Sequence, residues 1–426
     1  MPDFITSRIR KETLRHLGIV FAENVLSRGL NFILIVLVAR ELGPEKYGLY
    51  SFVTVSILFL GVFLDFGMEN TAVRFSGKYG DKREGIFGVY FIFKSAMLAA
   101  LLFLILLYPR ALALLVNKPL VEKYLLIIFI GCVMESYQYV ITTYLQSLER
   151  FTARAVINAG VFLVRLVSIF VLLQMSVPDI RTVSFFFALS GLPFVLVCSG
   201  YFAGFFRSLF SYNISRDMLK EILHYAKWIA AGSVAMNIMT RLDFYVIVSF
   251  LSFREAGLYN SAFQLVSPLM VVSLVFGKVF LPKVSKYTEL SRIKAYIRKA
   301  AAAGAVVSLM LILVLPFSRD VILFVFGREY SDAFGVFGIL LVSYVFTLWN
   351  VMFGIAFYSM GYSKYMTMGA YVELVIFAAC SFILVPRLGM EGAAWSRMIA
   401  SAGYLGAVVL FMYRKIYCVN RQEGLP

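Results

Sequence analysis

The sequence predicts an all-α integral membrane protein with twelve transmembrane helices in two six-helix lobes related by a parallel repeat. Composition is the first evidence: of 426 residues, 61% are hydrophobic and only 15% are charged, with a mean hydropathy of +0.84. Soluble domains average about 45–50% apolar and about 25% charged residues. The second observation is a series of long apolar segments, and the third is a polar pattern that recurs after 209 residues.

Twelve segments are apolar over about 20 residues, the length a helix needs to cross a hydrocarbon layer of about 30 Å. In chain order the expected spans are 17–39, 46–66, 86–108, 123–145, 152–175, 182–205, 226–251, 257–281, 296–317, 333–357, 364–385 and 392–413. Six precede the basic connector 206–227, which we expect to form a short interfacial helix, and six follow it. We therefore expect lobes at 1–210 and 211–426, inserted in the same orientation because each has an even number of spans.

The positive charge is distributed unevenly between the two sides of these spans. The chain has 40 Lys and Arg against 24 Asp and Glu, a net charge of +16. On the side of the N-terminus the loops and tails hold 25 of the basic residues, and the opposite loops hold 10. By the positive-inside rule both termini are cytoplasmic and the protein is multi-pass in the cytoplasmic membrane. The excess charge serves topology and membrane lipids, so we expect no nucleic-acid partner.

A polar stripe runs along the first expected span. Its five residues fall within an arc of about 140° at 100° per residue, so they share one helix face: Glu23, Asn24, Ser27, Arg28 and Asn31. Polar side chains are costly in lipid, and this face is therefore expected to line a hydrated space.

The same stripe returns in the seventh span. A shift of 209 residues places Asn24, Arg28 and Asn31 on Ser233, Asn237 and Thr240, which again share a face. The same shift aligns segment 48–50 (GLY) with 257–259 (GLY) and Arg74 with Lys283. This pattern is typical of transporters built from repeats, in which the polar faces line a central cleft.

Five basic residues lie inside the expected spans: Arg28, Lys94, Arg165, Arg241 and Arg397. Each costs roughly 2.5–3.5 kcal/mol at the bilayer centre, which favours a hydrated, functional location. Arginine suits bidentate contact with phosphate oxygens, so a cationic cleft indicates a substrate with a phosphate-type head group. The expected substrate contacts are Arg28, Arg165 and Arg241, with the amides of Asn24, Asn31 and Asn237.

Structural explanations for several of these charges stay open. Lys94 and Arg397 lie where a long side chain can snorkel to the surface. Arg241 could pair with Asp243, although residues two apart do not face each other on a helix. Glu23 could instead neutralise Arg28 or its neighbours. The expected intramembrane acids can take up H⁺ or bind Na⁺ and so couple transport to an ion gradient: Glu23, Asp65, Glu135, Asp243 and Glu373.

Enzyme chemistry has little support in the sequence. Only two histidines occur, and there is no HExxH, GxSxG or P-loop motif and no metal-ligand cluster. No cofactor is expected. The four cysteines show no CxxC spacing, and the connecting loops are too short for a catalytic domain.

Four segments carry a family resemblance. Segment 39–50 (ARELGPEKYGLY) resembles the A-R-x-L-G-P-x-x-Y-G-x-[YF] element of oligosaccharide flippases, the polysaccharide-biosynthesis members of the multidrug/oligosaccharidyl-lipid/polysaccharide exporter superfamily. Asp65-Phe66-Gly67 followed by Arg74 resembles their D-x-G…R element. Segments 280–285 (FLPKVS) and 385–394 (VPRLGMEGAA) resemble the elements after the eighth span and between the last two.

The resemblance implies a V-shaped bundle that opens alternately to the cytoplasm and the exterior. The implied cargo is a polyprenyl-diphosphate-linked oligosaccharide, moved outward for surface polysaccharide or glycoconjugate assembly. It places Arg28 in the cationic cleft and Arg74 at its cytoplasmic mouth. A multidrug or metabolite exporter of the same superfamily is the alternative, and a membrane glycosyltransferase or polymerase is a third, weaker hypothesis.

Overall fold

The structure is a computed structural model that describes residues 2–175, 179–201, 215–270, 290–359 and 363–414, with single positions between 273 and 284. Every secondary-structure element in these ranges is helical, which confirms the all-α prediction. The chain divides into two compact units. Unit 1 comprises residues 1–42 and 49–238, and unit 2 comprises 43–48 and 239–426.

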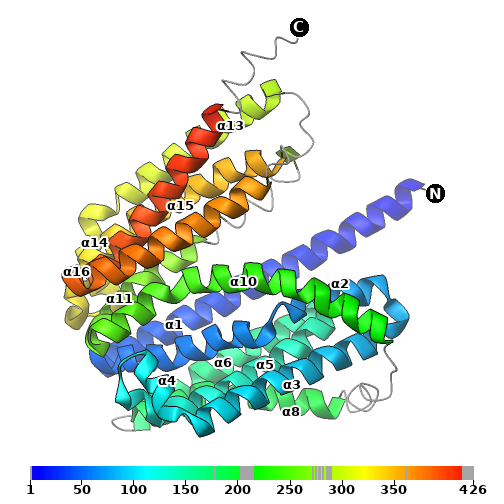
Figure 1. Ribbon diagram of the computed structural model, residues 1–426, viewed down its shortest axis with the longest axis horizontal. Helices are drawn as coiled ribbons and strands as arrows, with labels where there is room; N and C mark the ends of the chain where they lie inside the picture. Colours follow the sequence, from blue (N-terminus) through cyan, green and yellow to red (C-terminus); the bar gives the residue numbers. More distant parts are fainter. Residues whose placement is uncertain are drawn as a thin grey trace. The chain divides into compact units, whose positions relative to one another are not determined.

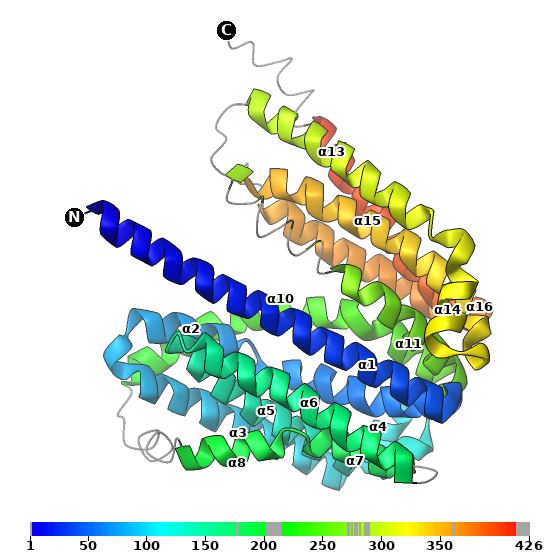
Figure 2. The same cartoon turned by 180° about the vertical axis from the view of Figure 1, so that it is seen from behind.

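Unit 1 is built around α5 (Leu125–Ser147), which packs against α2 (Met68–Lys78), α3 (Arg83–Leu107), α6 (Phe151–Met175), α7 (Ile180–Leu189) and α8 (Leu192–Tyr201) (Figures 1 and 2). The remaining helices of this unit are most of α1 (Pro2–Asp65), η1 (Gly80–Lys82), α4 (Pro109–Leu115), η2 (Pro119–Tyr124) and the first part of α10 (Arg216–Phe250). The described part of the expected interfacial helix is continuous with α10, so it is not a separate element.

Unit 2 is built around α15 (Phe334–Ser359), which lies beside α13 (Leu290–Ile312) and α16 (Ser363–Tyr413) (Figure 1). The shorter elements α11 (Phe253–Val266), η3 (Ser267–Leu269), η4 (Leu315–Phe317), α14 (Ser318–Phe326) and η5 (Arg328–Ala333) complete its described part, with the end of α10.

Eight helical stretches within the described residues are long and apolar enough to cross a membrane. Two of them, Gly18–Asp65 and Met368–Tyr413, span 48 and 46 residues, about twice the length of one crossing. Each contains one residue outside helical geometry, Gly43 (φ 71°) and Gly389 (φ 65°), where glycine tolerates the positive φ. The expected sixth and eighth spans extend beyond the described residues, and the count of twelve stays a prediction.

The 209-residue shift also relates the helical elements of the two halves. The 3₁₀ helix η2 covers 119–124 and η5 covers 328–333, so both bounds match after the shift. Helices α5 and α15 begin at 125 and 334, again 209 residues apart. The repeat predicted from the polar stripe therefore extends to element boundaries.

The repeated glycines meet in a close backbone contact. A methyl group on Gly48 would lie 1.7 Å from the Phe253 carbonyl oxygen, and one on Gly257 would lie 2.0 Å from the Pro44 carbonyl oxygen. Since Pro44 and Phe253 are also 209 residues apart, the two contacts are equivalent under the repeat. Only glycine allows the backbones to approach this closely.

Apolar side chains divide between the interior and the helix exteriors. The core of unit 1 joins α2, α3, α5 and the start of α10 through residues such as Phe75, Phe87 and Ile222. Many large apolar side chains are exposed instead, for example Leu106 and Phe324 at 66% and 82%. Such exposure fits a multi-pass membrane protein, whose outer surface contacts lipid.

Candidate functional site

The polar face of α1 contains both buried and exposed side chains. Glu23 and Ser27 are buried, whereas Asn24 and Arg28 are exposed and Asn31 is intermediate. Within the described residues, Arg28 forms no salt bridge. The exposed guanidinium is therefore available to an anion.

One carboxyl oxygen of Glu23 accepts a hydrogen bond from an amide on α6, which is itself oriented by an amide on α5. The Asn158 side-chain amide on α6 donates to Glu23 Oε1 at 2.5 Å, and Gln138 on α5 donates to Asn158 Oδ1 at 3.3 Å. This chain of amides fixes the carboxyl group without using Arg28. Glu23 therefore does not neutralise Arg28 in this conformation.

Unit 1 contains a pocket of about 150 Å³, lined among others by Asp65, Lys94, Glu135 and Asn237. Lys94 is 1% exposed, and its Nζ lies 3.2 Å from Asp65 Oδ1. The Tyr90 hydroxyl donates to the same carboxyl oxygen at 2.7 Å. Lys94 is thus a buried ion-pair partner and does not snorkel to the surface.

Arg165 on α6 forms a buried ion pair with Glu135 on α5. Its Nε also donates to Ser190 Oγ at 2.6 Å, and its guanidinium carbon lies 4.1 Å from the centroid of the Phe187 ring. These contacts occupy the guanidinium inside unit 1. Arg165 was expected to contact the substrate, but in this structure its guanidinium is buried among protein groups.

Arg74 lies on the exposed side of α2, with its guanidinium carbon 4.2 Å from the centroid of the Tyr225 ring on α10. Nearby, Lys78 Nζ lies 2.8 Å from Glu221 Oε1. The hydrogen bond between them raises the pKa of Lys78 and lowers the pKa of Glu221. Both stay ionised near neutral pH, and they tie α2 to the start of α10.

In unit 2, Asp243 is the centre of a second buried cluster. Arg397 on α16 contacts Asp243 Oδ2 through Nε at 2.9 Å and Nη2 at 2.6 Å. The Tyr259 hydroxyl on α11 donates to the same oxygen, and Arg397 also donates to the Met239 carbonyl at 3.1 Å. Arg397 therefore points into unit 2, and the partner of Asp243 is Arg397 instead of Arg241.

Arg241 and Glu373 each have a separate partner in unit 2. Arg241 donates to Asn260 Oδ1 at 3.4 Å, and Asn260 donates to the Tyr47 hydroxyl at 3.0 Å. Glu373 on α16 accepts a hydrogen bond from the Ser401 hydroxyl at 3.0 Å. Asn237, the repeat equivalent of Arg28, donates to the Ser233 carbonyl at 2.7 Å and lines the pocket of unit 1.

Sequence patterns did not identify Tyr90 and Tyr259 as partners of Asp65 and Asp243. Polar residues follow both tyrosines, Lys94 after Tyr90 and Asn260 after Tyr259, but a helical pattern does not show which distant carboxylate a tyrosine meets. The shift of 209 does not relate them either, because it pairs Tyr50 with Tyr259. Within the described ranges, no group of three or more His, Cys, Asp or Glu could hold a metal ion.

Comparison with known proteins identifies the class to which this fold and these sites belong. The chain belongs to the polysaccharide biosynthesis protein family, whose profile matches residues 13–288. It is 22% identical to a putative O-antigen transporter of Shigella flexneri over 188 residues. This aligned region covers 43% of this chain and 45% of that protein. It is 20% identical over 402 residues to a probable low-salt glycan biosynthesis flippase of Haloferax volcanii, covering 90% of this chain and 80% of that protein.

Solved structures show the same fold. A lipid II flippase in an inward-closed conformation superposes with a TM-score of 0.75 at 14% identity, covering 92% of this chain and 87% of that chain. An inward-facing multidrug transporter of the MATE family gives a TM-score of 0.67 at 15% identity, covering 93% and 96%. The chain therefore has the fold of the superfamily suggested by its sequence motifs.

Proposed function

We propose that this protein is a flippase that translocates a polyprenyl-diphosphate-linked oligosaccharide across the cytoplasmic membrane by alternating access. Its product serves surface polysaccharide or glycoconjugate assembly, and both termini lie in the cytoplasm. Membership in the polysaccharide biosynthesis family and the names of the two relatives support the substrate class. The buried ion pairs and the repeat support a transport protein with polar helix faces.

The observation that carries the proposal is the contrast between Arg28 and the other intramembrane cations. Lys94, Arg165 and Arg397 are each paired with a carboxylate, and Arg241 contacts the amide of Asn260. Arg28 is exposed on a polar helix face. An unneutralised guanidinium at this depth costs free energy unless an anionic ligand or water solvates it. A diphosphate fits that requirement.

In the proposed cycle, the diphosphate meets Arg74 at the cytoplasmic mouth and then Arg28. Asn24 and Asn31 contribute hydrogen bonds along the same face of α1, and the lipid tail stays in the bilayer. Arg165 connects helices within unit 1 and Arg241 connects helices within unit 2, whereas Asn237 bonds to the carbonyl of Ser233 in its own helix. A cargo that stabilises both end states equally shifts neither, so direction comes from glycan consumption outside or from H⁺ or Na⁺.

The decisive experiment replaces Arg28 in the native host. Arg28→Ala is expected to abolish surface glycan while protein abundance in the membrane holds, because the diphosphate loses its cation. Arg28→Lys is expected to retain partial function. Arg110→Ala removes an exposed cation from α4 and serves as the matched control with normal glycan. Normal surface glycan in Arg28→Ala would refute the assigned role.

The MATE-like fold makes a multidrug or metabolite exporter the second candidate. The two functions differ in what a deletion does to the cell. If the protein is a flippase, its deletion removes surface glycan and leaves sensitivity to cationic drugs unchanged. If it is an exporter, its deletion increases sensitivity to cationic drugs and leaves surface glycan intact. Minimum inhibitory concentrations for cationic dyes, measured beside the glycan assay, separate them.

A further inference from the structure

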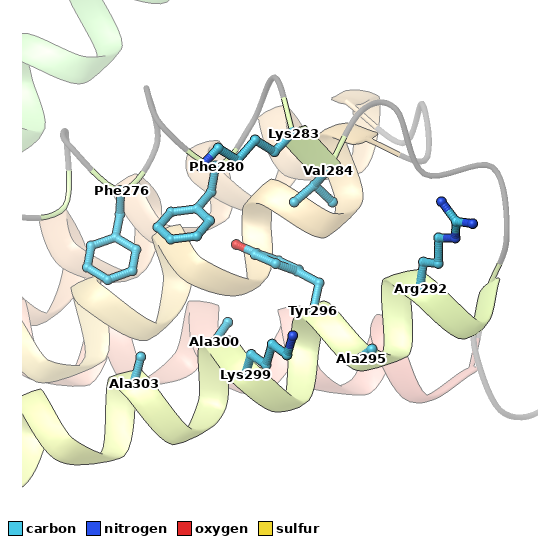
Figure 3. A pocket seen from close by; sticks show the side chains of 10 residues that line it. All are labelled: Phe276, Phe280, Lys283, Val284, Arg292, Ala295, Tyr296, Lys299, Ala300 and Ala303. Carbon is cyan, nitrogen blue, oxygen red and sulfur yellow. The ribbon is translucent and has the colours of Figure 1, made fainter.

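A pocket of about 550 Å³ in unit 2 has no counterpart in the transport scheme above (Figure 3). It lies along α13 and the described residues between 276 and 284. Its lining combines three aromatic and three basic side chains with a floor of alanines; the six larger residues are Phe276, Phe280, Tyr296, Lys283, Arg292 and Lys299.

The aromatic side chains form a fixed wall. Phe276 and Phe280 stack with ring centroids 5.2 Å apart, and Tyr296 lies 6.2 Å from Phe280. The Tyr296 hydroxyl donates to the Met352 carbonyl on α15 at 3.1 Å, so this ring is anchored to a neighbouring helix. Lys283 Nζ lies 5.8 Å from the Phe280 ring centroid, which places a cation beside the apolar wall (Figure 3).

The repeat explains why this space is open. In the first half, the equivalent α3 positions hold larger side chains: Ile86 belongs to the core, Phe91 packs against it, and Lys94 pairs with Asp65. A shift of 209 converts these three positions into Ala295, Ala300 and Ala303, which line the pocket. The same shift converts the buried Tyr90 into Lys299. At these four positions the second half thus has three smaller side chains and one cation, and the smaller side chains leave room for the pocket.

The surrounding charge indicates what the cavity holds. Segment 278–299 contains 7 Lys and Arg, the largest number in any expected loop, and lies on the side of the N-terminus. The positive-inside rule assigns that side to the cytoplasm, where the membrane leaflet carries acidic lipids. Basic pockets between transmembrane helices at this level suit lipid phosphates, and an apolar wall suits an acyl chain.

We propose that this pocket binds an acidic glycerophospholipid of the inner leaflet. The phosphate head group contacts Lys283, Arg292 and Lys299, and one acyl chain lies against Phe276, Phe280 and the alanine floor. The lipid occupies the space that the three alanines leave beside α13, and it stabilises α13 against its neighbours. The proposal is independent of the transported substrate.

Native mass spectrometry of the purified full-length protein tests this directly. The probes are phosphatidylglycerol, phosphatidylcholine, polyprenyl diphosphate and inorganic phosphate, each titrated into detergent-solubilised protein. Lys299→Gln is expected to weaken phosphatidylglycerol binding about fivefold, since a basic residue near the membrane surface is worth about 1 kcal/mol. Arg298→Gln changes an exposed neighbour that does not line the pocket, and binding is expected to be unchanged.

A second pair of variants tests the cavity. Ala300→Phe restores the first-half residue and is expected to abolish binding of phosphatidylglycerol, whereas Ala302→Phe, exposed on the same helix, leaves it intact. Lys299 is exposed, so Lys299→Gln keeps the test valid if Ala300→Phe fails to fold. Equal binding in the pocket variants and their controls would overturn the proposal. The proposal would also be overturned if the pocket variants weakened the binding of polyprenyl diphosphate only, or of inorganic phosphate only.

Discussion

At the scale of single residues, the five intramembrane cations differ in their partners: three are paired with carboxylates, Arg241 contacts an amide, and Arg28 is exposed. Lys94, Arg165 and Arg397 each contact a carboxylate that comes from another helix. Buried pairs of this kind hold helices in one arrangement but add little net stability, because both charges lose their hydration. Removal of one partner from such a pair is destabilising, because the other partner stays buried with an uncompensated charge.

The Arg165–Glu135 pair gives a prediction at this scale. Glu135→Gln removes the carboxylate and leaves Arg165 buried without a counter-charge, so the free energy of unfolding should fall by about 3–5 kcal/mol. The measurement is thermal unfolding of the purified protein in detergent. The double variant Glu135→Leu, Arg165→Met should recover most of the loss, because it removes both charges. If Glu135→Gln unfolds at the wild-type temperature, the pair does not carry this role.

At the scale of elements, the sequence predicted the positions of helices and their polar faces better than it predicted which helices contact each other. The expected spans 123–145 and 333–357 match α5 and α15, whereas the equivalent 3₁₀ helices η2 and η5 emerged only from the structure. A periodic pattern shows which face of a helix is polar, but it does not show which distant helix meets that face. Asp243 and Arg397 are 154 residues apart, so their pairing required the tertiary structure. The same reason left Arg241 and Asp243 as an open pair in sequence.

The glycine contact between Gly48 and Gly257 gives the element-scale prediction. Gly48→Ala and Gly257→Ala each place a methyl group within about 2 Å of a backbone carbonyl oxygen, so both should lower the yield of folded protein and the unfolding temperature. Overpacking of this kind costs typically about 1–3 kcal/mol or more. Thermal unfolding in detergent provides the measurement.

The matched control is Gly232→Ala in α10, where an added methyl group meets no heavy atom within 4 Å. Alanine favours a helix over glycine, so this variant should be as stable as the wild type or slightly more stable. Wild-type stability of both Gly48→Ala and Gly257→Ala would contradict the close approach.

At the scale of the whole molecule, charge placement and the repeat predict how the chain crosses the membrane. Basic residues concentrate on one side of the expected spans, and each half begins on that side. The fold of the superfamily is shared over more than nine tenths of the chain. The cationic cleft itself stays a prediction, since sequence patterns place polar faces on helices without placing the two lobes.

Reporter fusions test the predicted orientation. Green fluorescent protein fused after residue 426 should fluoresce, because the positive-inside rule keeps that end in the cytoplasm. Alkaline phosphatase inserted in 109–122 should be active, because this loop is expected outside. In a separate fusion, alkaline phosphatase placed after residue 426 should be inactive. Activity there would contradict the assigned topology and would place the basic pocket in the other leaflet.

The six residues 43–48 belong to unit 2 although they lie within the first quarter of the chain. A gene fragment that encodes only residues 239–426 would therefore lack the turn of α1 against which Gly257 is seated. Chimaeras that exchange whole halves with a relative will need to transfer 43–48 together with the second half. Grafts cut only at the basic connector should yield mismatched proteins, even when both donors fold well alone.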